Sequence, residues 1–309
     1  MKDLSIVLGG IAGLFALYYG AEALVRGGRA VAIRARVSPL IIGLTLVAFG
    51  TSAPELFVST WAAIDGLGDV CVGNVVGSNI CNIALILGLT AIINPISVNP
   101  LLFQRDVPLM LLASLATMVL CCVYGGMGIV AGVVFLAILV GYTLWSVADS
   151  RGHEGHGEKS EMSLLIAVLA TIGGLAALVL GAKLLLLSTM HLERQFGVAD
   201  EIIALTAVAI GTSLPELATS LVAAKRGEAD IAIGNIIGSN IFNLLGILGF
   251  SACLAPFKIE GMCGIDFAFM LATALMLWPL MLWRKRLGLR EGAVLLITYA
   301  IYLALLFHR

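Results

Sequence analysis

The sequence predicts an all-α polytopic membrane protein with ten transmembrane helices, arranged as two inverted repeats of five helices each. Three observations lead to this fold class. Of the 309 residues, 60% are hydrophobic and only 12% are charged, whereas a soluble domain carries about 25% charged residues. Ten apolar segments each approach the roughly 20 residues that a helix needs to cross a bilayer. One long stretch of sequence occurs twice, with its copies 161 residues apart.

The ten expected spans follow one another with short connections and a single longer polar interruption. Their ranges are 4–25, 40–64, 70–93, 107–124, 127–148, 163–189, 200–224, 231–255, 264–283 and 291–307. The first span is too long for the apolar core of a signal peptide and lacks a clean cleavage site, so we expect it to be retained. The polar interruption, 149–162, is expected to be a cytoplasmic linker. It separates a first five-helix repeat, 1–148, from a second, 163–309.

Lys and Arg are unevenly distributed between the two sides of the membrane. If the N-terminus lies outside, the inward-facing connections contain thirteen of these residues and the outward-facing ones contain four. Basic residues accumulate on the cytoplasmic side of membrane proteins. The sequence therefore predicts that both termini face out, in what we expect to be the plasma (inner) membrane of a prokaryote.

The remaining composition argues against several other classes of function. No block of basic residues indicates a nucleic-acid partner. The six cysteines lie in or beside apolar segments, without the spacing of a metal site or of a disulfide framework. We therefore expect the cysteines to be small core residues, and we expect no cofactor.

The first copy of the duplicated stretch covers the second and third spans, and the second copy covers the seventh and eighth. Positions 41–89 and 202–250 align without a gap and share 27 identities in 49 positions. Five spans separate each element from its copy, and because five is an odd number the two copies cross the membrane in opposite directions. Inverted repeats of this kind are typical of secondary transporters, which bind their cargo near the bilayer midplane where the halves meet.

The first half of each copy reads Gly-Thr-Ser-x-Pro-Glu and places a carboxylate, Glu55 or Glu216, inside an apolar span. An acidic residue at the centre of a spanning helix costs roughly 2.5 to 3.5 kcal/mol. Glycine and proline loosen the helical backbone there, and hydroxyl oxygens lie about one turn away. These hydroxyls belong to Thr51, Ser52, Thr212 and Ser213. Broken helices that offer oxygen ligands at membrane depth indicate a cation site.

Further oxygens come from backbone and amide groups. Ala48 and Ala209 sit near positions where the prolines would release carbonyls, so they are candidate backbone ligands. The second half of each copy reads Gly-Asn-x-x-Gly-Ser-Asn-x-x-Asn and ends at Asn82 or Asn243. Calcium takes six to eight such hard oxygens, whereas zinc, copper and iron favour nitrogen or sulfur. Two carboxylates balance one divalent cation, although the same oxygens could also hold Na⁺.

The paired motifs resemble the two alpha repeats of the calcium/cation antiporter superfamily, in its sodium/calcium exchanger branch. The resemblance covers both alpha repeats, 40–93 and 200–255, and the ten-span layout. In that family the Glu after Pro binds Ca²⁺ and Na⁺ with help from neighbouring hydroxyl and amide groups. Carried over, the resemblance implies the ligands Glu55, Glu216, Thr51, Ser52, Thr212, Ser213, Ser78, Ser239, Asn82 and Asn243. It also implies that spans 4–25 and 163–189 move as a gating bundle.

One position departs from the family pattern. Many sodium/calcium exchangers carry Asp where this chain has Asn243, so the predicted site holds two formal negative charges and not three. Calcium still matches two carboxylates, but the counter-ion is left open, because proton-coupled relatives also use a Glu pair. Those relatives usually have Gly-Asn where this chain has Gly50-Thr51 and Gly211-Thr212, which favours Na⁺.

The sequence therefore predicts a Ca²⁺/Na⁺ antiporter, not an enzyme, that works by alternating access as a monomer in the lipid bilayer. A Ca²⁺/H⁺ antiporter is the alternative within the same class, and a cation channel is the alternative from another class. An intramembrane protease with paired carboxylates would leave the hydroxyl and amide groups around each Glu unexplained.

Overall fold

The structure, a computed structural model, describes residues 2–151, 162–195, 211–261 and 264–307. Within these ranges eight helices are long and apolar enough to cross a membrane, and a bent pair makes a ninth candidate. The chain is thus a mostly helical polytopic membrane protein. The seventh expected span, 200–224, lies partly outside the described residues, so the count of ten stays a prediction.

The first half of the described chain contains nearly continuous helix interrupted by short turns. Its elements are α1 (Lys2–Ala35), α2 (Pro39–Ile42), the π-helix η1 (Gly43–Val47), α3 (Ala48–Thr51), α4 (Ala53–Ile64), α5 (Gly68–Ile80), the π-helix η2 (Cys81–Leu87), α6 (Gly88–Ile93), β1 (Ile96–Ser97), the π-helix η3 (Leu102–Asp106), α7 (Val107–Tyr124), β2 (Gly126–Met127) and α8 (Ile129–Arg151). Because α8 continues to Arg151, it takes up the first residues of the stretch that was expected to be a linker.

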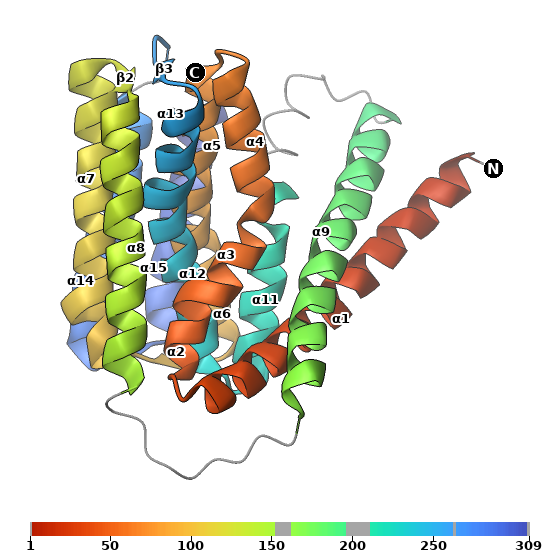
Figure 1. The fold of residues 1–309 in the computed structure, drawn as a ribbon. Coiled ribbons are helices and arrows are strands. Elements are labelled where there is room, and N and C mark those ends of the chain that lie inside the picture. The colour runs from red at the N-terminus through yellow and green to blue at the C-terminus, as the bar shows by residue number, and fades with distance from the viewer. Residues whose placement is uncertain (1, 152–161, 196–210, 262–263, 308–309) are drawn as a thin grey trace.

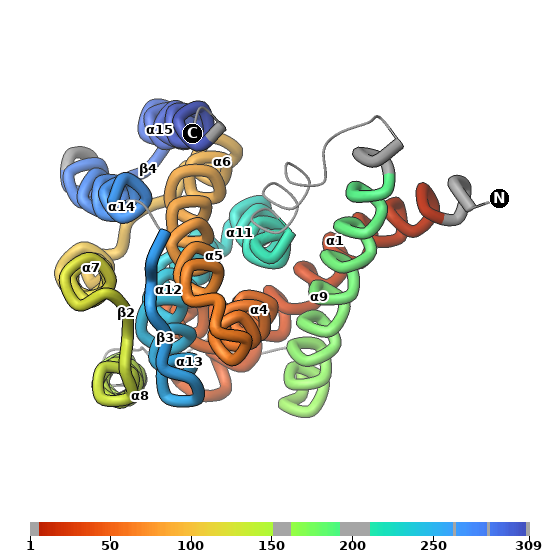
Figure 2. Tube along the Cα trace, turned by 90° about the horizontal axis from the view of Figure 1, so that it is seen from above, coloured from red at the N-terminus to blue at the C-terminus, as the bar shows by residue number. Residues whose placement is uncertain are grey.

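The second half repeats much of this order. Its described elements are α9 (Leu164–Gln195), α11 (Leu214–Lys225), α12 (Ala229–Ile241), the π-helix η4 (Phe242–Ile247), α13 (Leu248–Leu254), β3 (Phe257–Lys258), α14 (Gly264–Arg284), β4 (Arg286–Leu287) and α15 (Leu289–Phe307). Most of the span formed by α12, η4 and α13 is buried inside the protein, although Phe250 and Leu254 near its end are exposed. This span lies among the other helices in the view from above (Figure 2).

The two halves are joined by two short antiparallel strand pairs. β1 pairs with β4 in the register Ile96↔Leu287, and β2 pairs with β3 in the register Met127↔Phe257. α1 begins and α15 ends on the side of the molecule where β2 and β3 lie, whereas α8 ends and α9 begins on the opposite side (Figure 1). The helices on either side of the 149–162 connection, α8 and α9, therefore meet it on the side of the molecule opposite both ends of the described chain.

Helices α1 and α9 pack on each other and lie beside the remaining helices (Figures 1 and 2). Glycines allow this close crossing. A Cβ added at Gly13 would lie 2.8 Å from the carbonyl oxygen of Gly181, and one added at Gly20 would lie 2.9 Å from that of Gly174. Small residues at such crossings let helix backbones approach closely in a membrane.

The first helix is longer than the expected span 4–25. It continues to Ala35, so the arginines that were expected in a connection lie on its last turns. Two of these arginines have hydrogen-bond partners, one within α1 and one elsewhere in the chain. Arg26 pairs with Glu22 at 2.8 Å, and Arg34 Nε donates to the carbonyl of Met162 at 2.8 Å. A tilted helix can keep these side chains in the interface while its apolar part crosses the membrane.

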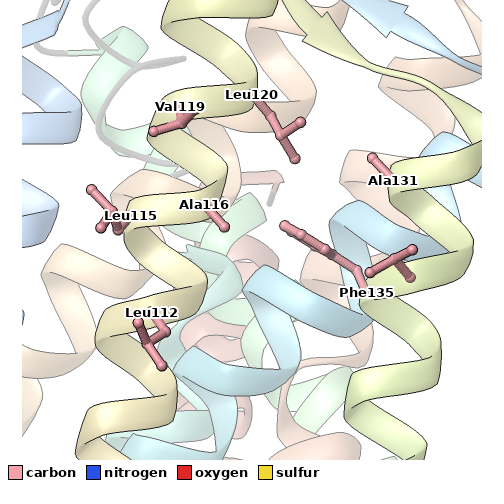
Figure 3. A pocket seen from close by; sticks show the side chains of 8 residues that line it. Leu112, Leu115, Ala116, Val119, Leu120, Ala131 and Phe135 are labelled. Carbon is pink, nitrogen blue, oxygen red and sulfur yellow. The ribbon is translucent and has the colours of Figure 1, made fainter.

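The outer helices present apolar side chains to their surroundings. Leu112, Val123 and Leu144 are 65%, 71% and 67% exposed. An apolar groove runs between α7 and α8, where Ala116 and Leu120 face Phe135 across the gap (Figure 3). Surfaces of this kind are unfavourable in water and are suited to the hydrocarbon of a bilayer.

A buried ion pair lies where the fourth span was expected to begin, at position 107. The helix starts five residues earlier, as η3, and brings Arg105 and Asp106 into the fold. The Arg105 side chain is 8% exposed, and that of Asp106 is fully buried. Arg105 Nε donates to Asp106 Oδ1 at 2.6 Å, and the hydroxyl of Tyr142 donates to the same oxygen at 2.9 Å. The guanidinium carbon also lies 5.2 Å from the centre of the Trp145 ring. The cluster joins η3 to α8.

Replacing Asp106 by Ala should destabilise the protein, because it leaves the Arg105 guanidinium buried without its nearest carboxylate. Removing one partner of a buried ion pair costs about 3 to 5 kcal/mol. Thermal unfolding of the purified protein in detergent should show a clearly lower midpoint for Asp106→Ala. Asp65→Ala, at an exposed position, should leave the midpoint unchanged. Equal midpoints for the two variants would mean that the cluster does not stabilise the fold.

Candidate functional site

Both copies of the Gly-Thr-Ser-x-Pro-Glu motif lie at a helix break. α3 ends at Thr51 and α4 starts at Ala53, and the segments on either side of the break are bent by 51°. Ser52, between them, has φ −83° and ψ 11°, and Ser213 before α11 has φ −87° and ψ 6°. The proline that follows each serine has no N–H with which to continue the helix. The break predicted from the sequence is therefore present in both halves.

As a result, both glutamates lie in the first turn of a new helix, where the positive end of the helix dipole favours a carboxylate. Glu55 is 1% exposed and Glu216 is 0% exposed. Ser52 Oγ donates to Glu216 Oε1 at 2.7 Å, and Ser213 Oγ donates to Glu55 Oε1 at 3.1 Å. Each serine thus binds the glutamate of the other half. The two carboxylates therefore lie close to each other in the interior and face away from the lipid.

Several oxygens around the carboxylates have no hydrogen-bond partner among the described residues. Asn74 Oδ1 and Thr219 Oγ1 are also buried without such a partner and lie outside the predicted ligand set. The other six oxygens are buried and belong to that set. They are Glu55 Oε2, Glu216 Oε2, Asn82 Oδ1, Asn243 Oδ1, Ser78 Oγ and Ser239 Oγ. Buried polar atoms are normally hydrogen-bonded, and an unsatisfied one costs about 1 to 3 kcal/mol. Three oxygens from each half share this property at equivalent positions.

The structure gives Thr51 and Ala48 partners within the protein. Thr51 Oγ1 lies 3.0 Å from Asn235 Oδ1 and 3.1 Å from the carbonyl of Val47. The carbonyl of Ala48 accepts the Ser52 N–H at 3.1 Å and lies 3.3 Å from Thr51 Oγ1. The Ala48 carbonyl is therefore bonded within its own helix and is not itself one that the proline releases. Thr212 is 7% exposed in the same region, and Ala209 lies outside the described residues.

Asn74 and Asn235 hold the glutamate-bearing helices and were not predicted to belong to the site. Asn74 Nδ2 donates to Ser59 Oγ at 2.9 Å and to the carbonyl of Glu55 at 3.4 Å. Asn235 Nδ2 donates to Ser220 Oγ at 3.0 Å and to the carbonyl of Glu216 at 3.4 Å. The sequence signals for these residues are that they are identical in the two copies and that they are the first Asn of the Gly-Asn-x-x-Gly-Ser-Asn-x-x-Asn motif.

The amide-bearing part of the site lies on unusual helix geometry. Asn82 lies in the π-helix η2 and Asn243 in the π-helix η4, at equivalent positions of the two copies. π-Helical turns inside α-helices are rare and are frequent at functional sites. The wider turn changes the direction of a side chain relative to that of its neighbours, so α-helical spacing alone does not give the direction of these two amides.

The charge and chemistry of the oxygens around Glu55 and Glu216 restrict what this site can bind. In the part of the chain that the structure describes, no group of three or more His, Cys, Asp or Glu side chains could hold a metal ion. The site combines two carboxylates with neutral hydroxyl and amide oxygens. Oxygen-only surroundings suit Ca²⁺ and other hard cations, and they do not suit metals that prefer nitrogen or sulfur.

Comparisons with known proteins agree with this chemistry. The chain is 37% identical to the inner membrane protein YrbG of Escherichia coli over 313 residues, covering 96% of this chain and 95% of that one. It is 30% identical to the sodium/calcium exchanger MaX1 of Methanosarcina acetivorans, covering 96% and 97% of the two chains. A solved structure of the sodium-calcium exchanger NCX_Mj superimposes with a TM-score of 0.87 at 33% identity, covering 98% of this chain and 99% of that one.

The family comparison covers both halves of the chain. The model of the family described as sodium/calcium exchanger protein matches residues 5–148 and 166–308. These two segments exclude the central polar connection and include both copies of the duplicated motif. The chain therefore belongs to the sodium/calcium exchanger protein family, a family of membrane transporters.

Proposed function

We propose that this protein is a secondary active antiporter that exchanges Ca²⁺ for Na⁺ at a site between Glu55 and Glu216. The observation that carries the proposal is the set of six buried oxygens, three from each half, that have no hydrogen-bond partner among the described residues. A cation would satisfy these oxygens, and two carboxylates would neutralise one Ca²⁺. The similar proteins MaX1 and NCX_Mj are both called sodium/calcium exchangers, which supports the same choice of ions.

In this proposal, the transported ions share one set of oxygen ligands. The set comprises Glu55, Glu216, Thr51, Ser52, Thr212, Ser213, Ser78, Ser239, Asn82, Asn243, Ala48 and Ala209. Calcium takes six to eight oxygens, so it would use a part of this set. Sodium would use overlapping oxygens, and the two ions would therefore exclude each other. A site with two uncompensated carboxylates is unfavourable inside a membrane. The protein therefore switches between its inward-facing and outward-facing states when an ion is bound, and this requirement couples the Ca²⁺ and Na⁺ fluxes.

The alternating-access step follows from two inverted repeats, 1–148 and 163–309, which the 149–162 linker connects. Contacts that recur 161 residues apart support the repeat. Ser52 with Glu216 corresponds to Ser213 with Glu55. The turn after α4 and the turn after α11 also match, since Gly66 has φ 76° and Gly227 has φ 79°. The close packing of α1 on α9 supports their movement as one gating unit against the other helices.

Two substitutions test the carboxylates. Glu55→Gln and Glu216→Gln each remove one of the two negative charges and keep the side-chain size, so each should reduce Na⁺-driven Ca²⁺ uptake into proteoliposomes to the level of protein-free liposomes. Glu260→Gln, at an exposed position, is the matched control and should retain wild-type uptake. Wild-type uptake by either site variant would remove that glutamate from the site.

The counter-ion is tested with the same vesicles. Ca²⁺ uptake by the unsubstituted protein should occur with an outward Na⁺ gradient and should be absent with an outward H⁺ gradient. Uptake driven only by H⁺ would replace the proposal with a Ca²⁺/H⁺ antiporter. Ca²⁺ flux that needs no counter-ion, together with single-channel currents, would instead establish a channel.

The proposed topology places both termini outside and the central linker in the cytoplasm of a prokaryotic cell. The E. coli relative is called an inner membrane protein, and the two ends of the described chain lie on the side opposite the end of α8 and the start of α9 (Figure 1).

The inverted repeat makes a labelling prediction. Position 65, after α4, and position 225, at the end of α11, are nearly equivalent in the two copies, and both are exposed. In a background without the native cysteines, a membrane-impermeant maleimide should label Asp65→Cys in intact cells. It should label Lys225→Cys only after permeabilisation. Labelling of both positions from the same side would contradict the inverted topology.

A further inference from the structure

Four asparagines form a closed hydrogen-bonded group where the two halves meet, and we call this group the asparagine cluster. Asn79 Nδ2 donates to the backbone carbonyl of Asn240 at 3.2 Å, and Asn240 Nδ2 donates to the backbone carbonyl of Asn79 at 3.3 Å. Asn243 Nδ2 donates to Asn79 Oδ1, and Asn82 Nδ2 donates to Asn240 Oδ1, both at 3.0 Å. All four side chains are at most 1% exposed.

The two backbone carbonyls determine the direction of every amide in the cluster. A carbonyl can only accept a hydrogen bond, so Asn79 and Asn240 turn their Nδ2 groups toward it. Their Oδ1 atoms then face Asn243 and Asn82 and need a donor there. Asn82 and Asn243 therefore direct Nδ2 into the cluster, and their Oδ1 atoms are left on the other side of each amide.

These Oδ1 atoms of Asn82 and Asn243 are among the buried oxygens that have no hydrogen-bond partner in the described part of the chain. We propose that Asn79 and Asn240 are positioning residues for ion exchange, which hold Asn243 and Asn82 with the amide oxygen toward the transported cation. The inference rests on the proposed function, because it assigns a role within the same site. A reversed amide would present its N–H groups, which carry positive partial charge, to the cation and would remove one ligand.

The cluster also limits the charge of the site. A deprotonated carboxylate at position 243 has no N–H, so it would face Asn79 Oδ1 with no proton between two acceptors. Asn79 cannot reverse its own amide, because its Nδ2 is bound to the backbone carbonyl of Asn240. The same argument holds for position 82 and Asn240. The cluster therefore favours amides at both positions and restricts the formal charge to that of Glu55 and Glu216.

A double-mutant cycle tests this role through the Ca²⁺ concentration dependence of Na⁺-driven uptake in proteoliposomes. Groups that orient a metal ligand typically contribute about 10- to 100-fold to affinity, so Asn79→Ala should raise the KM for Ca²⁺ by about that factor, with a smaller effect on kcat. Because Asn79 acts through Asn243, adding Asn79→Ala to Asn243→Ala should change KM by less than about twofold. Added to Asn82→Ala, which Asn240 holds, it should still raise KM severalfold.

The outcomes separate the cluster from the proposed function. If the unsubstituted protein shows no Na⁺-driven uptake, the proposed function is wrong. If uptake is normal and the effects of Asn79→Ala and Asn243→Ala on KM simply multiply, the positioning role is wrong. If Asn79→Ala does not fold, the reciprocal cycle with Asn240→Ala and Asn82→Ala gives the same test. Thr90→Val is the control, since Thr90 is buried on the same span and, in the part of the chain that the structure describes, its hydroxyl bonds to the Ile86 carbonyl of that span and to no other group.

Discussion

The structure depends on the burial of two carboxylates, Glu55 and Glu216, side by side at membrane depth. Two like charges repel strongly where water is excluded, so the surrounding chain has to supply donors without filling every carboxylate oxygen. Ser52 and Ser213 each supply one donor to the opposite glutamate. The helix breaks bring both carboxylates to helix N-termini, and the second oxygen of each has no hydrogen-bond partner among the described residues. The bent helices and the crossing of the two halves follow from this requirement.

The local sequence predicted the apolar spans well, but it did not predict how far the helices continue into the charged residues at the ends of these spans. The break between α3 and α4 was predictable, because glycine and proline act on the backbone where they stand. The extension of α1 to Ala35 was not predictable, because a group of arginines after an apolar span is typical of a connection between helices. They belong to the helix since their partners, such as the carbonyl of Met162, come from distant parts of the chain. The same holds for Arg105, whose carboxylate partner and aromatic neighbours make a helical position acceptable inside the fold.

In the site, too, some residues are predictable from the local sequence and others are not. A carboxylate in an apolar span indicates function by its own desolvation cost, and its repetition in the second half argues against a simple proline kink with a charged neighbour. Amides are different, because an asparagine can be a ligand, a packing residue or a positioning residue, depending on which groups face it. The sequence predicts Asn82 as a ligand and assigns no such role to Asn79 or Asn235, although all three are identical in the two copies. Only the hydrogen bonds to Asn240 and Ser220 separate these roles.

The reciprocity of these bonds connects binding to conformational change. The serine that bonds each glutamate and the asparagine that orients each amide come from the opposite half, so neither half can complete the site alone. A shift of one half relative to the other would separate donors and acceptors at several points at once. Ligand geometry, and hence ion affinity, would then differ between the inward-facing and outward-facing states of the protein. A bound cation that favours the state in which these hydrogen bonds are all formed would shift the equilibrium between the conformational states by its differential affinity for them. Such a shift is the requirement for coupled exchange.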